Sequence, residues 1–252
     1  MVAETAPLGL EIADRAQIPG VVNANFDWHW LYSRLSITHP KLQALATEAY
    51  EWYQKSVLAL RLPFAVGLEE TFSDLLDVPL LVGKSDRDPS AIRQALGLPA
   101  ESPVFMWNIG GHPGSTPDFD AMLLSLPDWH LISYAAFDTD NPRYHQIDPR
   151  FNTTEIFSVL DALIGKLGYC TCAEAHTFQV PFLFFARNGY PEDDALAEHT
   201  LRLVPSAPVA PAEIGCEGWL EKFQTVVTMD RSKRPRRDGA AVAADYYTDL
   251  LV

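Results

Sequence analysis

Residues 158–200, SVLDALIGKLGYCTCAEAHTFQVPFLFFARNGYPEDDALAEHT, carry the strongest indication of the fold of this chain. Apolar residues at helical spacing predict a helix over residues 154–164, which runs into the turn at residues 165–169. A short helix around Glu174 and a buried strand at residues 182–185 follow, and an acidic loop comes after them. A glycine turn that opens a helix and then leads into a buried strand is typical of a parallel α/β sheet.

The same alternation extends to both sides of this stretch. A helix begins at Asp88 and Pro89, which suit the N-cap and the first helical position, and it ends at Gly97. Further elements alternate after it, with strands at 104–109 and 131–136 and helices at 121–126, 218–227 and 240–250. We therefore predict a doubly wound parallel sheet for residues 85–252.

Residues 1–84 predict a smaller α/β part. Residues 1–17 look like a loose lead-in, and a strand at residues 21–26 ends in an aromatic cluster. From Pro40 onward, apolar positions follow the 3.6-residue period of a helix. Short strands are expected at 65–66 and 78–82. This pattern is typical of the second half of an α/β domain.

The composition is that of an ordinary globular protein with an acidic balance. Hydrophobic residues make up 48% of the 252 residues and charged residues 21%, and the formal net charge is −14. This charge argues against nucleic acid as a partner, because phosphate backbones are bound by clustered Lys and Arg. The basic cluster at residues 231–237 is flanked by acids and is interpreted as a solvated loop. No metal-ligand motif stands in a convincing place.

Neither membrane insertion nor secretion is predicted. The chain contains no apolar run near the roughly 18 residues that span a bilayer. Its first 16 residues carry acids early and lack a basic region followed by an apolar core, so they are not typical of a signal peptide. The expected location is the cytoplasm.

Five segments carry a resemblance to a known family. They are NFDWHWLY at 25–32, VPLLV with RQALG at 78–82 and 93–97, FMWNIGGHPG at 105–114, and GKLGYCTCAE at 165–174. In this order and context they resemble the GT-B glycosyltransferases. More closely, they look like the glycosyltransferase-like region that precedes the kinase domain in plant L-arabinokinases. The resemblance covers about residues 18–250.

The resemblance implies a GT-B-like fold in two parts. Residues 1–84 would be a partial acceptor-side α/β domain, and residues 85–252 a Rossmann-like donor domain. Members of the family ordinarily begin with a strand and a Gly-His-rich turn. Nothing similar precedes Ala24, so we expect the N-terminal domain to be incomplete. The chain has no G-x-x-x-x-G-K-[ST] loop, and we expect no kinase activity.

The first candidate binding loop for a nucleotide sugar contains Gly110, Gly111 and His112, directly after a predicted strand. Glycines let backbone N–H groups approach an anion closely, and a helix start nearby favours negative charge. A tight strand-to-helix turn without a ligand is the alternative. The resemblance favours the ligand.

The second candidate loop contains Gly168, Thr171 and Glu174. The resemblance implies that Glu174 accepts hydrogen bonds from both ribose hydroxyls, which an ionised carboxylate can do. Thr171 and the turn would face the diphosphate at the helix N-terminus. Lys166 would add a positive charge there, although a solvated lysine also fits. A capping or surface acid is the alternative for Glu174.

A third loop and a possible base complete the candidate residues. By the resemblance, Arg187 and Asp193 would hold the sugar or its phosphate, although a solvent-facing group of acids at a helix start explains Asp193 equally well. An inverting transfer needs a base near the acceptor hydroxyl, and Asp27 and His29 are the weak catalytic candidates. A packed core histidine is the alternative for His29.

Two functions stay open at this point. The first is a glycosyltransferase-like protein that binds a nucleotide sugar, with a UDP-sugar as the expected donor, and that transfers the sugar if an acceptor side can form. No other cofactor is expected. The second is a non-catalytic or truncated module that acts by binding. An incomplete sheet would leave an unpaired edge, so we also expect a homo-oligomer.

Overall fold

The computed structural model describes residues 1–110, 117–216 and 218–250 of the chain. Its contacts define two units that do not follow the sequence continuously. The first unit consists of Met1–Leu81, Asn188–Leu196 and Pro235–Val252, and the second consists of Val82–Arg187 and Ala197–Arg234. A single boundary at residue 84, as drawn from the sequence, does not describe this division, because the chain enters each unit more than once.

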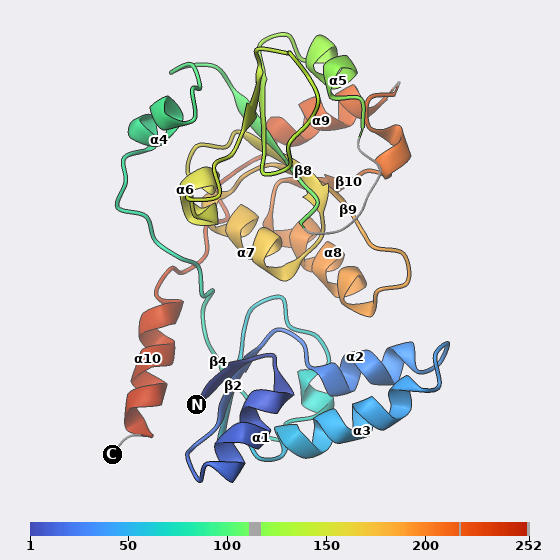
Figure 1. Cartoon of the computed structure of the whole chain (residues 1–252), viewed down its shortest axis with the longest axis vertical. Coiled ribbons are helices and arrows are strands. Elements are labelled where there is room, and N and C mark those ends of the chain that lie inside the picture. Colours follow the sequence, from blue (N-terminus) through green and yellow to red (C-terminus); the bar gives the residue numbers. More distant parts are fainter. Residues whose placement is uncertain (111–116, 217, 251–252) are drawn as a thin grey trace. The chain divides into compact units, whose positions relative to one another are not determined.

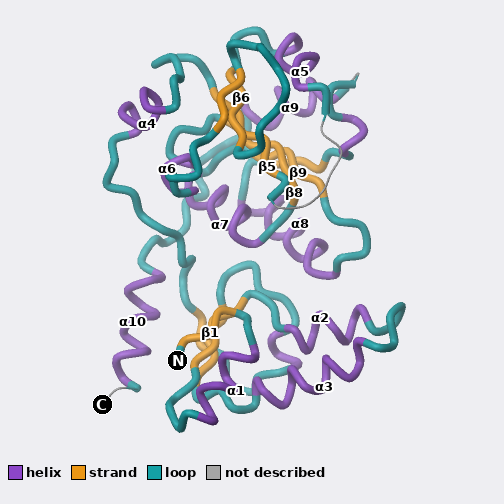
Figure 2. The backbone as a smooth tube through the Cα atoms, in the orientation of Figure 1, coloured by secondary structure: helices purple, strands orange, loops and turns teal. Residues whose placement is uncertain are grey.

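The first unit is built on a parallel four-stranded sheet in the order β1-β2-β3-β4. Figure 2 draws these strands in orange near the label β1. Its strands are β1 (Val2–Glu4), β2 (Val21–Ala24), β3 (Leu58–Arg61) and β4 (Leu76–Asp77). Its helices are α1 (Pro7–Arg15), α2 (Trp28–Leu35), α3 (Leu42–Tyr53) and α10 (Gly239–Asp249), with a 3₁₀ turn at Leu68–Glu70. Leu10, Val22 and Tyr53 are among the buried residues of its core.

The interpretation of residues 1–17 as a loose lead-in is wrong. They form β1, which pairs with β2 from Val2↔Val21 onward, and helix α1. Pro7 occupies the first turn of α1, where its missing N–H costs nothing, and Leu10 is fully buried. One buried apolar face is enough to stabilise a nine-residue helix against a sheet, although its sequence signal is weak.

The short strands expected at 65–66 and 78–82 are also displaced. The third strand lies at Leu58–Arg61, and β4 is the two-residue strand Leu76–Asp77. Val78 N still donates to Arg61 O at 3.1 Å, but Pro79 has no N–H with which to continue the ladder. The apolar run after β4 therefore leaves the sheet.

Helix α10 packs in the first unit, although the sequence placed it in the second part of the chain. Gly239 lies so close to the backbone that an added Cβ would stand 2.4 Å from the carbonyl oxygens of both Pro79 and Leu80. Further along the helix, the Tyr247 hydroxyl donates to Asn23 Oδ1 at 2.7 Å. These contacts join the last helix to the sheet of the first unit (Figure 1).

The second unit contains a six-stranded parallel sheet in the order β10-β9-β8-β5-β6-β7. Its strands are β5 (Val104–Asn108), β6 (His130–Ser133), β7 (Tyr144–Gln146), β8 (Ala162–Lys166), β9 (Phe182–Phe185) and β10 (Ser206–Pro208). Its helices are α4 (Pro89–Ala95), α5 (Phe119–Ser125), α6 (Thr153–Phe157), α7 (Tyr169–Phe178) and α9 (Trp219–Val227), with a 3₁₀ turn at Pro211–Glu213, and α8 (Pro191–Leu203) is shared between the units.

The strand order reverses between β5 and β8. From β5 the chain adds β6 and β7 on one side, and it then returns to add β8, β9 and β10 on the other. Because parallel crossovers are right-handed, the helices that connect the strands of the two halves cover opposite faces, and α9, which follows the last strand, returns to the face of α5. Helices α5 and α9 pack against one apolar core through Met122 and Phe223 (Figure 1). The expected fold class, a doubly wound parallel sheet beside a smaller α/β part, is confirmed.

The helix predicted over residues 154–164 is wrong in its second half. Helix α6 begins with a capping box in which Asn152 and Glu155 bond each other's backbone N–H, and it ends at Phe157. Residues 162–166 are then the central strand β8, paired with β5 and β9. A strand buried on both faces has a continuous apolar sequence, so its pattern does not differ from that of a buried helix.

No helix in the described ranges combines the length and the apolar character needed to cross a membrane.

Candidate functional site

The carboxyl ends of β5 and β8 meet where the strand order reverses. In this register Asn108, the last residue of β5, lies opposite Gly165 of β8. Ligands of doubly wound sheets bind in the crevice at such a position, because the loops on its two sides lead away to opposite faces. The two predicted loops of the donor site begin at these two strand ends.

Gly165 allows the two strand ends to approach closely. An added Cβ at this position would lie 2.1 Å from the carbonyl oxygen of Asn108, a distance that real Cβ atoms do not adopt. The backbone of β5 therefore occupies the space that any other residue would need. Gly165 is a requirement of the sheet, and it brings the two loops together.

Asn108 connects both loops. Its Oδ1 accepts a hydrogen bond from Gly110 N at 3.0 Å, and its Nδ2 donates to Thr171 Oγ1 at the long distance of 3.5 Å. Gly110 has φ +58°, a left-handed conformation that favours glycine. Of the predicted residues of the first loop, Gly111 and His112 lie outside the described residues.

Lys166 lies between the two glycines that begin the loops. A Cβ added at Gly110 would lie 3.8 Å from Lys166 Cε, and one added at Gly168 would lie 3.5 Å from Lys166 Nζ. The ammonium group donates to the backbone oxygen of Leu167 at 3.1 Å. A cation is thus placed at the strand ends, beside the start of α7.

Helix α7 begins at Tyr169, three residues after Lys166. Gly168 is its N-cap residue and has no side chain to accept a hydrogen bond from the first turn. The helix macrodipole adds positive potential at the same end. Gly168, Thr171 and Lys166 therefore surround a position that suits a phosphate group.

Glu174 lies on the second turn of α7 and is 9% exposed. Its Oε1 accepts a hydrogen bond from the Thr153 hydroxyl at the start of α6. Burial raises the pKa of Glu174, and the Thr153 hydrogen bond opposes that rise. Burial also raises the pKa of the neighbouring Tyr134 hydroxyl, with a smaller contribution from Glu174. Thr153 itself is exposed, so the carboxylate is covered by a group at the surface.

The third predicted loop is divided between the units. Arg187 is half-buried after β9 and ends a segment of the second unit, whereas Asp193 belongs to the first unit. Asp193 is only 1% exposed in the first turn of α8, and Glu192 beside it accepts a hydrogen bond from Asn25 Nδ2 at 2.9 Å. A solvent-facing group of acids does not describe these two side chains.

Asp27 and His29 are used within the first unit. Asp27 is fully buried and is the N-cap of α2, where its Oδ1 accepts from Trp30 N at 2.7 Å. Burial raises the pKa of Asp27. His29 is half-buried, with Nδ1 at 3.0 Å from Ala46 O and its ring 4.9 Å from that of Tyr50. The position of His29 matches the alternative of a packed core histidine, and Asp27 serves as a helix cap.

Asn108 and Thr153 were not among the residues predicted for the site. Asn108 is a polar residue near the end of the predicted strand 104–109 and lies two positions before a glycine pair, which is a signal that could have identified it. Thr153 has no such signal, because its contact with Glu174 joins residues 21 positions apart. Within the described part of the chain, no group of three or more His, Cys, Asp or Glu side chains is arranged to hold a metal ion.

The fold is that of the GT-B glycosyltransferases. The structure is similar to the calicheamicin glycosyltransferase CalG4, with a TM-score of 0.63 and 17% identity over 99% of this chain and 72% of that one. It is also similar to UGT2 of Phytolacca americana, solved with UDP-2-fluoro-glucose and pterostilbene, with a TM-score of 0.54 and 10% identity over 99% of this chain and 69% of that one. At these identities the similarity establishes the fold.

The sequence is similar to an L-arabinokinase from Arabidopsis thaliana. The two are 27% identical over 202 residues, which is 78% of this chain and 19% of that protein. The chain therefore spans about a fifth of the length of this relative. No protein-family model matches the sequence. The resemblance to GT-B glycosyltransferases and to L-arabinokinase expected from the motifs is confirmed.

Proposed function

We propose that this chain binds a nucleotide sugar, with a UDP-sugar as the donor, at the carboxyl ends of β5 and β8. The diphosphate lies against the N-terminus of α7, near Lys166 and Gly110. The ribose hydroxyls bind Glu174. Gly168 has no side chain that would stand between the helix start and the phosphate, and Thr171 contacts the phosphate from the first turn.

The observation that carries this proposal is the contact between Glu174 and Thr153. In the structure, a hydroxyl of an exposed side chain donates to a buried carboxylate. A ribose hydroxyl offers the same donor, so it can take the place of the threonine hydroxyl without leaving the carboxylate unpaired. Glu174 is thus placed to exchange a partner of the protein for a partner on the ligand.

Arg187, which follows β9 in the second unit, is proposed to contact the sugar or its phosphate. Arginine suits either a phosphate or a sugar carboxylate, because its guanidinium can form two parallel hydrogen bonds. Titrating the wild type and Arg187→Lys with a UDP-hexose and with a UDP-uronic acid would show which group the arginine contacts. A loss of affinity for both ligands would indicate the phosphate, and a loss for the uronic acid alone would indicate the sugar carboxylate.

Transfer of the sugar is a further step, and a non-catalytic binding module is the second candidate function. The observation that favours this candidate is that both residues expected to act as base are engaged inside the first unit. Mass spectrometry of reactions with a panel of UDP-sugars and sugar acceptors separates the two candidates. A glycosylated product would support transfer, and UDP binding without product would support the binding module.

The test of nucleotide binding is calorimetric titration of the whole chain with UDP and with ADP. We expect UDP to bind at micromolar concentration and Glu174→Ala to weaken binding at least tenfold, because two hydrogen bonds to a charged group are lost. The matched control is Glu221→Ala, since Glu221 is exposed on α9. Unchanged affinity in folded Glu174→Ala would refute the assignment of the site.

A further inference from the structure

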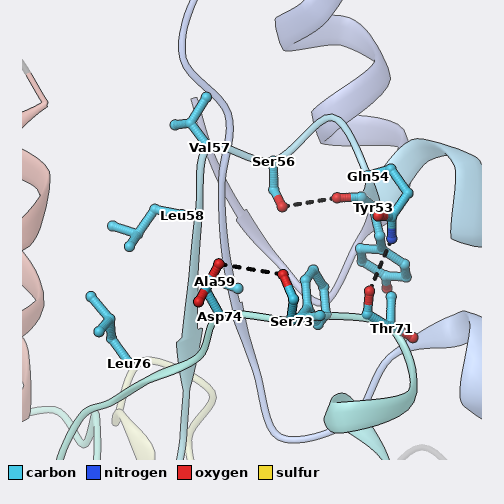
Figure 3. A pocket seen from close by; sticks show the side chains of 11 residues that line it. Tyr53, Gln54, Ser56, Val57, Leu58, Ala59, Thr71, Ser73, Asp74 and Leu76 are labelled. Carbon is cyan, nitrogen blue, oxygen red and sulfur yellow. Dashed lines mark hydrogen bonds between the residues drawn. The ribbon is translucent and has the colours of Figure 1, made fainter.

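The first unit contains a pocket of about 350 Å³ beside β3 (Figure 3). Its walls are the end of α3, the first residues of β3 and the segment 71–76 that leads into β4. It therefore lies at the amino-terminal ends of β3 and β4. Asp27 follows the carboxyl end of β2, so it lies at the other end of the sheet. Its volume is within the range of small-molecule sites.

The sheet explains why a pocket exists here. Strand β4 pairs with β3 only at Leu60 and Arg61, so the register includes no partner in β4 for Leu58 or Ala59. Segment 71–76 instead approaches from the side and leaves a gap between itself and β3. The gap is a product of the short β4 and does not depend on the second unit.

Two polar side chains on one wall are already bonded to the backbone. Ser56 Oγ donates to Tyr53 O at 2.8 Å, and Gln54 Nε2 donates to Thr71 O at 2.9 Å (Figure 3). These bonds use the hydroxyl hydrogen of Ser56 and one amide hydrogen of Gln54. The oxygens of both side chains keep lone pairs that can accept hydrogen bonds.

The charge of the pocket is negative. Asp74 is exposed on the opposite wall and accepts a hydrogen bond from Ser73 Oγ at 3.3 Å. Among the described residues that line the pocket there is no Lys, Arg or His. The nearest cation along the chain is Lys55, whose ammonium group pairs with Glu11 and with Asp14 of α1. The carboxyl end of α3 adds a partial negative charge.

The remaining lining is apolar. The ring of Phe72 packs edge-on against that of Tyr53, with centroids 5.4 Å apart and an interplanar angle of 70°. Leu58 is half-buried, and Val57 and Leu76 are 57% and 38% exposed. A ligand that fits this lining combines a donor-rich cation with an aliphatic part.

We propose that this pocket binds a small organic ammonium ion with a short aliphatic stem. The ammonium group, which carries only donors, lies between Asp74 and the acceptor oxygen of Ser56, on the two walls of the pocket (Figure 3). The stem packs along Ala59 and Phe72, which belong to the same apolar cluster. The net charge of −14 attracts such a cation to the molecule, and the pocket selects where it binds. This inference does not rest on nucleotide-sugar binding.

The experiment is a titration of the ¹⁵N-labelled whole chain with n-butylammonium, followed through amide chemical shifts. We expect saturable shifts confined to residues 54–59 and 71–76. Asp74→Asn should weaken binding by about fivefold, the upper range for an exposed ion pair. Asp74 is exposed, so this variant is expected to keep the fold.

Two controls separate this site from general attraction of cations. Glu48→Gln removes the same charge from an exposed position on α3 and should leave the affinity unchanged. Butan-1-ol has the same stem without the charge and should bind more weakly than the ammonium ion. Shifts that spread over the chain without saturation, equal weakening by both variants, or equal binding of the alcohol would each overturn the proposal.

Discussion

Two strand-to-helix turns of the molecule begin their helices in different ways. After β2, the chain reaches Asp27 and starts α2; after β8, it reaches Gly168 and starts α7. The first turn uses a carboxylate to cap its helix, so the helix N-terminus is satisfied from within. The second turn has a glycine in that place, which has no side chain with which to cap the helix.

The buried carboxylates of the two turns differ in the same way. Asp27 and Glu174 both have a pKa raised by burial. Asp27 bonds a backbone N–H that cannot leave, whereas Glu174 bonds the hydroxyl of an exposed side chain that can rotate away. An acid after a strand therefore indicates a ligand site only when its partner in the free protein can be exchanged.

The largest expected effect is on the backbone approach that places the second turn. Gly165→Ala should destabilise the chain by about 3 kcal/mol, because its Cβ would overlap the carbonyl of Asn108. Gly168→Ala is the matched control, since its Cβ would meet only the end of Lys166 at an ordinary contact distance of 3.5 Å. Urea unfolding of both variants tests this difference. Equal stability of the two would show that the strands can separate at no cost.

A smaller effect is expected at the first turn. Asp27→Ala should lower the free energy of unfolding by about 1 kcal/mol, because α2 loses its N-cap. The same variant should leave the affinity for UDP unchanged, in contrast with Glu174→Ala. Unfolding and calorimetry on the same samples measure both quantities. A loss of UDP affinity in a folded Asp27→Ala protein would remove the distinction between the two turns.

The smallest effect is the pH dependence of the second turn. The ionised carboxylate of Glu174 accepts hydrogen bonds, and burial raises its pKa above the usual value of 4.5. The affinity for UDP should therefore be highest above this raised pKa, where Glu174 is ionised, and should fall as the pH decreases through it. Titrations at several pH values compare the wild type with Glu174→Gln, which also corrects for ionisation of the UDP phosphate. Parallel curves would mean that Glu174 does not titrate in the site.

The stability of the free protein has the opposite dependence on this group. A raised pKa in the folded state means that Glu174 contributes stability below its unfolded pKa, and that the contribution is lost as the pH rises through the folded value. Lowering the pH therefore protonates Glu174, which weakens nucleotide binding and removes the free-energy cost of burying the charged carboxylate.

The class of fold could be predicted from local patterns. The buried strands at 104–108 and 182–185, the helix start at Asp88–Pro89 and the helix start at Gly168 each have a signal contained within a few residues, because they depend on backbone propensity and short-range capping. The two short edge strands β7 and β10 were missed, since three residues contain too little pattern.

Long-range pairing was beyond any local pattern. The run Ala162–Lys166 became a central strand because β5 and β9 bond it on both sides, and the same letters would suit a helix. Likewise α10 joined the first unit because only its packing against Pro79 and Leu80 specifies where it lies.

The candidate site shows the same division. Gly168, Thr171 and Glu174 were identified from one continuous motif, because a helix N-terminus and an acid one turn further are set by spacing along the chain. That Asn108 and Thr153 meet these residues, and that Lys166 meets Gly110, depends on the order of strands in the sheet, which follows from burial of apolar surface across the whole unit.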